Sequence, residues 1–114
     1  MAAARPTIST HILDTDRGMP AHGLAVAVFR LTEDGGSELI NELETDVDGR
    51  ITDLLDGEEL EVADYQILFD VASYRGEDSF FQGCAVGLRI DDAERSYHVP
   101  LLVAPFGLTT YRGS

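Results

Sequence analysis

Two histidines stand in short segments whose residue pattern would let them do acid/base chemistry. His11 alternates with apolar residues over 8–13, and His98 is flanked by apolar residues over 97–102. Imidazole is the side chain whose unperturbed pKa lies closest to neutrality, so two strand histidines converging on one cleft would form a general acid/base pair. Taken alone, each histidine is more simply interpreted as a hydrogen-bonded or surface residue of a strand.

Arginine is the second candidate group. All eight basic residues are Arg, and Arg50 directly follows an Asp-Gly turn. It could be an exposed strand start, or it could clamp an anion or a carbonyl, because the planar guanidinium binds delocalised oxygens bidentately. The segment Tyr111-Arg112-Gly113-Ser114 offers a phenol, a guanidinium and a hydroxyl within four residues. It is either a solvated tail or, if the last strand holds it, a dense polar group.

The sequence lacks the motifs of several other common catalytic, nucleotide-binding and metal-binding sites. The sequence has no G-x-S-x-G, H-E-x-x-H, P-loop or G-x-G-x-x-G pattern, and its two Asp-x-Asp pairs lack the offsets of a calcium loop. The one cysteine, Cys84, cannot form an internal disulfide or a Cys-based metal site, and we expect it to be a small packing residue.

Composition restricts the partners. The 114 residues carry 21 Asp and Glu against 8 Lys and Arg, a formal charge of -13, which disfavours nucleic acid and anionic membranes. No apolar run is long enough to span a membrane, and no apolar segment follows Arg5, so we expect a cytoplasmic protein. The absence of Lys fits either a GC-rich genome or adaptation to high salt.

Alternation and turn residues predict an all-β sandwich or barrel of seven or eight strands. The expected strands span residues 8–13, 24–31, 38–45, 65–69, 85–90, 97–103 and 108–112. Residues 69–75 are expected to form about two turns of helix, after which Phe80 and Phe81 would return to the core. Pro100 lies inside an expected strand and therefore predicts an edge, a bulge or a solvent-facing nitrogen. We expect a short tail over 1–6 and a single domain over 7–114.

Three separated motifs, in order, carry a family resemblance. They are ISTHILDTDRGMPA (8–21), TDVDGR (45–50) and YHVPLLVAPFGLTTYRGS (97–114). Together they resemble the 5-hydroxyisourate hydrolases, transthyretin-like enzymes of urate breakdown, and the Tyr-Arg-Gly-Ser ending separates these from transthyretin itself, a hormone carrier. The resemblance implies a transthyretin-like β-sandwich of two four-stranded sheets with one short helix. It also implies a homotetramer whose sites lie in clefts where subunits meet.

The resemblance also implies the site and the reaction. His11, His98 and Arg50 match the family's catalytic residues, and Arg50, Tyr111, Arg112, Gly113 and Ser114 match its substrate-binding residues. The implied reaction is hydrolysis of a ring amide of 5-hydroxyisourate by general acid/base activation of water, with no metal or cofactor, although the histidines could bind zinc adventitiously. The alternative is a non-catalytic small-molecule carrier of the same fold.

The sequence departs from the family pattern at four positions that are not implied site residues. Asp46 stands where Asn is usual, Ala104 replaces a common Ser, and Phe106 and Leu108 stand where Tyr is often found. These differences concern the hydrogen bonding around the cleft rather than the type of reaction.

Overall fold

The first strand, β1 (Ile8–Asp14), presents different chemistry on its two faces. In the computed structural model, which describes residues 5–113, Ile8, Thr10 and Ile12 are buried, whereas Ser9 and His11 are half-buried on the opposite face. Successive side chains of a strand point to opposite sides, so this alternation is the one that the sequence predicts. One face of β1 therefore builds the core and the other is available for a site.

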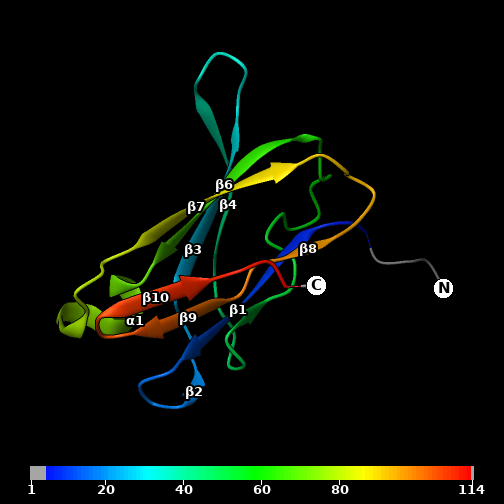
Figure 1. The fold of residues 1–114 in the computed structure, drawn as a ribbon. Helices are drawn as coiled ribbons and strands as arrows, with labels where there is room; N and C mark the ends of the chain where they lie inside the picture. Colours follow the sequence, from blue (N-terminus) through cyan, green and yellow to red (C-terminus); the bar gives the residue numbers. More distant parts are fainter. Residues whose placement is uncertain (1–4, 114) are drawn as a thin grey trace.

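Two sheets pack face to face (Figure 1). The first has the order β10-β9-β1-β2, with β5 and β8 also paired to β1, and the second has the order β4-β3-β6-β7. The remaining strands are β2 (Met19–Pro20), β3 (Ala25–Leu31), β4 (Ser37–Glu44), β5 (Arg50–Ile51), β6 (Ala63–Asp70), β7 (Cys84–Ile90), β8 (Tyr97–His98), β9 (Leu101–Ala104) and β10 (Gly107–Thr110). The turn between β3 and β4 projects beyond the rest of the molecule.

The expected sandwich is confirmed, with an addition to the first sheet. Its main path has the expected four strands, and the two-residue strands β5 and β8 extend it along β1. The strand expected over 97–103 is split into β8 and β9 at Val99 and Pro100. Proline has no backbone N–H to give to a neighbouring strand, which is the physical reason for the break.

The core lies between the two sheets. Ile8 and Ile12 of β1 belong to the same buried cluster as Tyr65, Ile67 and Phe69 of β6, and all of them are at most 1% exposed. Burying a large apolar side chain contributes about 1.5 to 3 kcal/mol, so this contact area fixes the position of β1. The strand that carries Ser9 and His11 is therefore anchored in the core through its opposite face.

The helical prediction is only partly confirmed. The helix α1 (Ala72–Arg75) has four residues and is followed by the 3-10 turn η1 (Gly76–Asp78). It starts later than expected because β6 continues to Asp70 with Phe69 buried as a strand residue. The expectation for the two phenylalanines is wrong, since Phe80 is 68% and Phe81 38% exposed. Within residues 5–113, no helix has the length and apolar character needed to cross a membrane.

Candidate active site

The half-buried face of β1 forms the floor of a polar pocket. In the strand pairing, His11 lies opposite Arg50 of β5, and Ser9 lies beside His98 of β8. The pocket has a volume of about 360 Å³. Its lining consists of Ser9, Thr10, His11, Arg50, Ile51, Thr52 and His98. The structure thus brings together the two histidines and the arginine that the sequence singled out.

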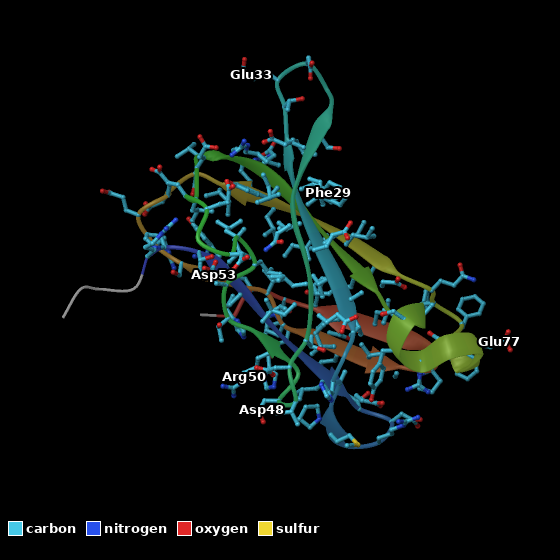
Figure 2. All side chains as sticks on the ribbon, turned by 180° about the vertical axis from the view of Figure 1, so that it is seen from behind. Phe29, Glu33, Asp48, Arg50, Asp53 and Glu77 are labelled. Carbon is cyan, nitrogen blue, oxygen red and sulfur yellow. The ribbon has the colours of Figure 1, made fainter. Side chains whose placement is uncertain are left out.

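A tight turn presents Arg50 to this pocket. Gly49 has φ 76°, and a Cβ there would lie 2.4 Å from the carbonyl oxygen of Ile12, so the turn requires glycine. The Asp46 carboxylate accepts hydrogen bonds from the backbone N–H groups of Asp48 and Arg50, each at 2.9 Å. The bond from the Arg50 N–H holds the pKa of Asp46 below its usual value. Figure 2 shows Arg50 beside Asp48 at this end of the molecule.

His98 is held in a defined environment. Its Nδ1 lies 2.9 Å from the Ser9 hydroxyl oxygen. Burial lowers the pKa of His98, and the nearby positive charges of His11 and Arg50 lower it further. Both effects outweigh a hydrogen bond to Ser9 that raises the pKa, so the neutral imidazole predominates at neutral pH and is available as a proton acceptor.

The end of β10 and the residues after it are hydrogen-bonded to β8 and to the residues that follow β8. The backbone N–H of Gly113 donates to the His98 carbonyl oxygen at 2.8 Å, and the Thr110 hydroxyl donates to the Pro100 carbonyl oxygen at 2.7 Å. A Cβ on residue 113 would lie 2.6 Å from Cδ2 of His98, so the glycine allows the backbone to touch the ring. Through Gly113, this segment is part of the histidine's surroundings.

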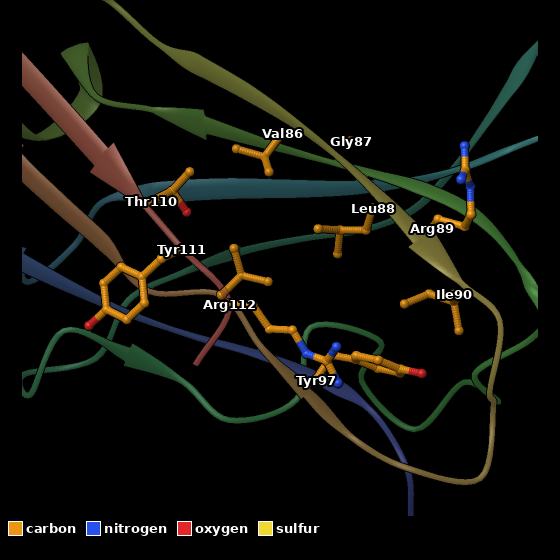
Figure 3. A pocket seen from close by; sticks show the side chains of 10 residues that line it. Val86, Gly87, Leu88, Arg89, Ile90, Tyr97, Thr110, Tyr111 and Arg112 are labelled. Carbon is orange, nitrogen blue, oxygen red and sulfur yellow. The ribbon is translucent and has the colours of Figure 1, made fainter. Parts of the chain in front are cut away.

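Tyr111 and Arg112 are exposed and line a neighbouring pocket of about 300 Å³ beside β7. The Arg112 guanidinium lies 5.3 Å from the centre of the Tyr97 ring, a cation–π contact that fixes its direction (Figure 3). In the single chain these two side chains do not line the pocket of His11 and His98. Ser114 lies outside the described residues.

The structure also identifies pocket residues that the sequence analysis did not propose. Ser9 contacts His98 directly, and Tyr97 contacts Arg112. Ser9 could have been found, because it shares a face of its strand with His11. For Tyr97, the sequence contains no indication of a pocket residue other than its position next to His98. Within residues 5–113, no group of three or more His, Cys, Asp or Glu side chains is arranged to hold a metal ion; His11 and His98 are the pocket residues that could ligate one.

Comparison with known proteins identifies the family. The sequence model of the HIUase/Transthyretin family matches residues 8–113. The chain belongs to this family. It is 37% identical to the 5-hydroxyisourate hydrolase of Mus musculus, with the whole of both chains covered. It is 38% identical to that of Halalkalibacterium halodurans, over 94% of this chain and 97% of the relative.

Solved structures of the family have the same backbone. The 5-hydroxyisourate hydrolase of Klebsiella pneumoniae superposes with a TM-score of 0.82 at 33% identity, covering 96% of this chain and 99% of that one. Transthyretin from Sparus aurata gives 0.87 at 29% identity, covering 96% and 97%. Hydrolase and transthyretin members therefore share one backbone, and the pocket residues must distinguish their chemistry.

Proposed function

We propose that this protein hydrolyses 5-hydroxyisourate to 2-oxo-4-hydroxy-4-carboxy-5-ureidoimidazoline, a step of urate degradation. The observation that carries this proposal is the convergence of His11, His98 and Arg50 on one pocket. Its support from outside the chain is the identity of 37% to 38%, over nearly full length, to relatives named as this hydrolase.

The reaction makes three chemical demands on the pocket. A water must lose a proton to become nucleophilic, negative charge must be stabilised on the attacked carbonyl oxygen, and the leaving nitrogen must gain a proton. A neutral imidazole can take the proton from water and later return one to the leaving nitrogen. The lowered pKa of His98, caused first by burial, leaves its imidazole in that neutral form.

Arg50 supplies the positive charge in this scheme. It lies opposite His11 across the β1–β5 pair, at the rim of the pocket. A guanidinium there holds the polar ring of the substrate and stabilises the developing oxyanion without giving up a proton. In this scheme His98 or His11 takes the proton from water, and no metal or cofactor is needed.

The remaining substrate contacts are assigned to Tyr111, Arg112, Gly113 and Ser114. Within the single chain, Arg112 is held by Tyr97 in the neighbouring pocket. We propose a cytoplasmic homotetramer, with one catalytic domain over 7–114, in which clefts between subunits bring this segment to the substrate. The separation of the two pockets within one chain supports a site completed by assembly.

The alternative function is a non-catalytic small-molecule carrier of the same fold. Its support is the backbone, which also matches sea bream transthyretin in complex with thyroxine at a TM-score of 0.85 and 30% identity, covering 93% of each chain. A carrier needs neither two histidines in register nor an arginine-presenting turn. These features favour the hydrolase.

Ultraviolet spectroscopy separates the two functions. Freshly generated 5-hydroxyisourate is followed with the intact protein, with a variant lacking residues 111–114 and without protein. We expect the intact protein to accelerate decay strongly and the truncated variant to do so weakly, with its β-rich circular dichroism retained. Decay at the spontaneous rate with the intact, folded protein would overturn the hydrolase proposal.

A further inference from the structure

The imidazole of His98 is contacted on both of its edges. On one edge, Nδ1 lies 2.9 Å from Ser9 Oγ. On the other, Cδ2 lies so near Gly113 that a Cβ there would be 2.6 Å away. These contacts fix the ring plane and leave Nε2 and Cε1 as the atoms that point away from both neighbours.

We propose that Ser9 is a positioning residue for the hydrolysis: its Oγ accepts a hydrogen bond from Nδ1–H of His98, which leaves the Nε2 lone pair to take the proton from water. The inference rests on the proposed function, which it deepens by naming His98 as the base and Nε2 as its working atom. Ser9 does not touch the substrate in this scheme and acts through His98.

The strand pairing holds the two residues in this relationship. Ser9 and His98 are partners in the parallel β1–β8 pair. On one side of them the backbone N–H of Tyr97 donates to the Thr7 carbonyl oxygen, and on the other the N–H of Val99 donates to the Ser9 carbonyl oxygen, both at 2.9 Å. Backbone hydrogen bonds before and after this residue pair therefore hold the Ser9 hydroxyl next to the His98 ring.

The proposed tautomer is the one in which Ser9 accepts the Nδ1 proton, and the groups around the ring support it. A neutral imidazole carries one proton, and the hydrogen bond made by one nitrogen decides which nitrogen holds it. Within residues 5–113, Nδ1 is the ring nitrogen with a hydrogen-bond partner; it lies against the Ser9 hydroxyl, and a hydrogen bond to the Ser9 backbone also raises the pKa of His98. The charged or titratable side chains that share the pocket with it are His11 and Arg50, and Gly113 contributes only backbone. A proton on Nδ1 thus has Ser9 as its acceptor and leaves Nε2 basic.

The proton balance of the step is complete. Nε2 takes one proton from water as the water oxygen bonds to the carbonyl carbon of the substrate ring. The ring carbon–nitrogen bond then breaks, and the imidazolium returns a proton to the leaving nitrogen. Ser9 remains an acceptor throughout, because Nδ1 carries its proton in both the neutral and the charged ring.

The kinetic test compares three variants. Ser9→Ala removes the acceptor, Ser9→Thr keeps a hydroxyl, and Ser37→Ala is the matched control at an exposed strand position in β4. Since misplacing a reacting group costs up to about 100-fold, we expect Ser9→Ala to lower kcat by about 10-fold to 100-fold with KM within about 2-fold. Ser9→Thr recovers most of the rate, and Ser37→Ala matches the parent. The acid limb of kcat/KM moves to lower pH in Ser9→Ala, because its imidazolium has lost an acceptor.

Nitrogen NMR of the histidine rings reads the tautomer without substrate. We expect Nδ1 of His98 to be protonated and Nε2 unprotonated in the parent, and a shift toward the Nε2–H form in Ser9→Ala. A parent ring protonated at Nε2, or a Ser9→Ala variant with unchanged tautomer and kcat, would overturn the inference while leaving the hydrolase intact. An inactive parent protein would instead overturn the proposed function.

Discussion

Gly113 lies against the edge of the His98 imidazole, where a Cβ would be 2.6 Å from Cδ2. The same residue donates its backbone N–H to the His98 carbonyl oxygen at 2.8 Å. The backbone of Gly113 is thus in contact with the His98 ring. Any side chain at position 113 would have to move either this backbone or the ring. The segment that carries Tyr111 and Arg112 is thereby coupled to the orientation of a proposed catalytic histidine.

Replacing Gly113 with Ala should reduce catalysis by moving the His98 ring. The added methyl group would clash with Cδ2, and a displacement of the reacting group of about 1 Å can cost 100-fold in rate. We expect kcat to fall by about 10-fold to 100-fold, measured from initial rates of 5-hydroxyisourate decay, with the thermal unfolding midpoint changed little because Gly113 lies outside the hydrophobic core.

Gly107→Ala is the matched control. It adds the same methyl group at the start of β10, where a Cβ meets nothing within 4 Å. We expect its rate to equal that of the parent. Equal rates in the Gly113 and Gly107 variants would show that the contact with the ring has no catalytic consequence.

The lowered pKa of His98 gives a direction for the pH dependence of the rate. Burial and the charges of His11 and Arg50 place the pKa of His98 below the ordinary 6.5, so more than half of the rings are neutral at that pH. We expect the acid limb of kcat/KM to have its midpoint below pH 6.5. The measurement is a pH–rate profile of kcat/KM in the free enzyme, and a decline centred above 6.5 would contradict it.

The sequence predicted the sandwich well because strand alternation and turn residues are local signals. The buried and half-buried faces of β1 follow directly from the alternation of Ile8, Ser9 and Thr10. The convergence of His11 with His98 could not be derived this way, because it depends on the pairing of β1 with β8 across about 90 residues of chain. It was reached only through the family resemblance.

The wrong prediction for Phe80 and Phe81 also arises from contacts between segments that are distant in the sequence. Phe80 and Phe81 are apolar, and hydrophobicity alone places them in the core, yet both are exposed. The chain there follows a short 3-10 turn, and the Phe80 N–H donates to the Pro105 carbonyl oxygen, which keeps the segment at the surface. Tertiary contacts of this type have no local sequence signal.

The surface charge predicts a dependence on salt. With a formal charge of -13 per chain, the body of the protein repels the urate-derived substrate, which we expect to be an anion. Screening shortens the reach of this repulsion to about 8 Å at physiological ionic strength. We therefore expect kcat/KM to rise between low and physiological salt, and a fall over that range would contradict the expectation.

Removing one negative charge at a time shows which part of the surface causes the salt dependence of kcat/KM. Asp48 is exposed beside Arg50, whereas Glu33 lies at the far β3–β4 turn (Figure 2). Asp48→Asn should raise kcat/KM at low salt, because it removes a negative charge next to the proposed anion contact, and Glu33→Gln should change it little. At high salt both variants should match the parent. A larger effect of Glu33→Gln would show that the local field at Arg50 is not decisive.

A buried ion pair predicts a large change in stability away from the pocket. The Asp14 carboxylate is fully buried, accepts a 2.8 Å hydrogen bond from the Tyr74 hydroxyl, and lies 3.5 Å from the guanidinium of Arg75, whose side chain is 7% exposed. Burial raises the pKa of Asp14, but the hydrogen bonds from the Arg17 N–H and Tyr74 and the charge of Arg75 outweigh it, so the pKa is lowered. The carboxylate therefore stabilises the fold above the ordinary value of 3.8, and this contribution is lost as the pH falls through the folded-state pKa.

Asp14→Asn should lower the free energy of unfolding by up to about 3 to 5 kcal/mol, because the buried Arg75 guanidinium then keeps only its 3.4 Å contact with the exposed Asp16 carboxylate. Urea titration near neutral pH measures the change, and the difference between parent and variant should shrink as the pH falls below 3.8 toward the folded-state pKa of Asp14. The double variant Asp14→Asn with Arg75→Met removes both charges and should recover much of the loss. If the single and double variants are equally destabilised, the Tyr74 hydrogen bond rather than the ion pair carries the stability of this region.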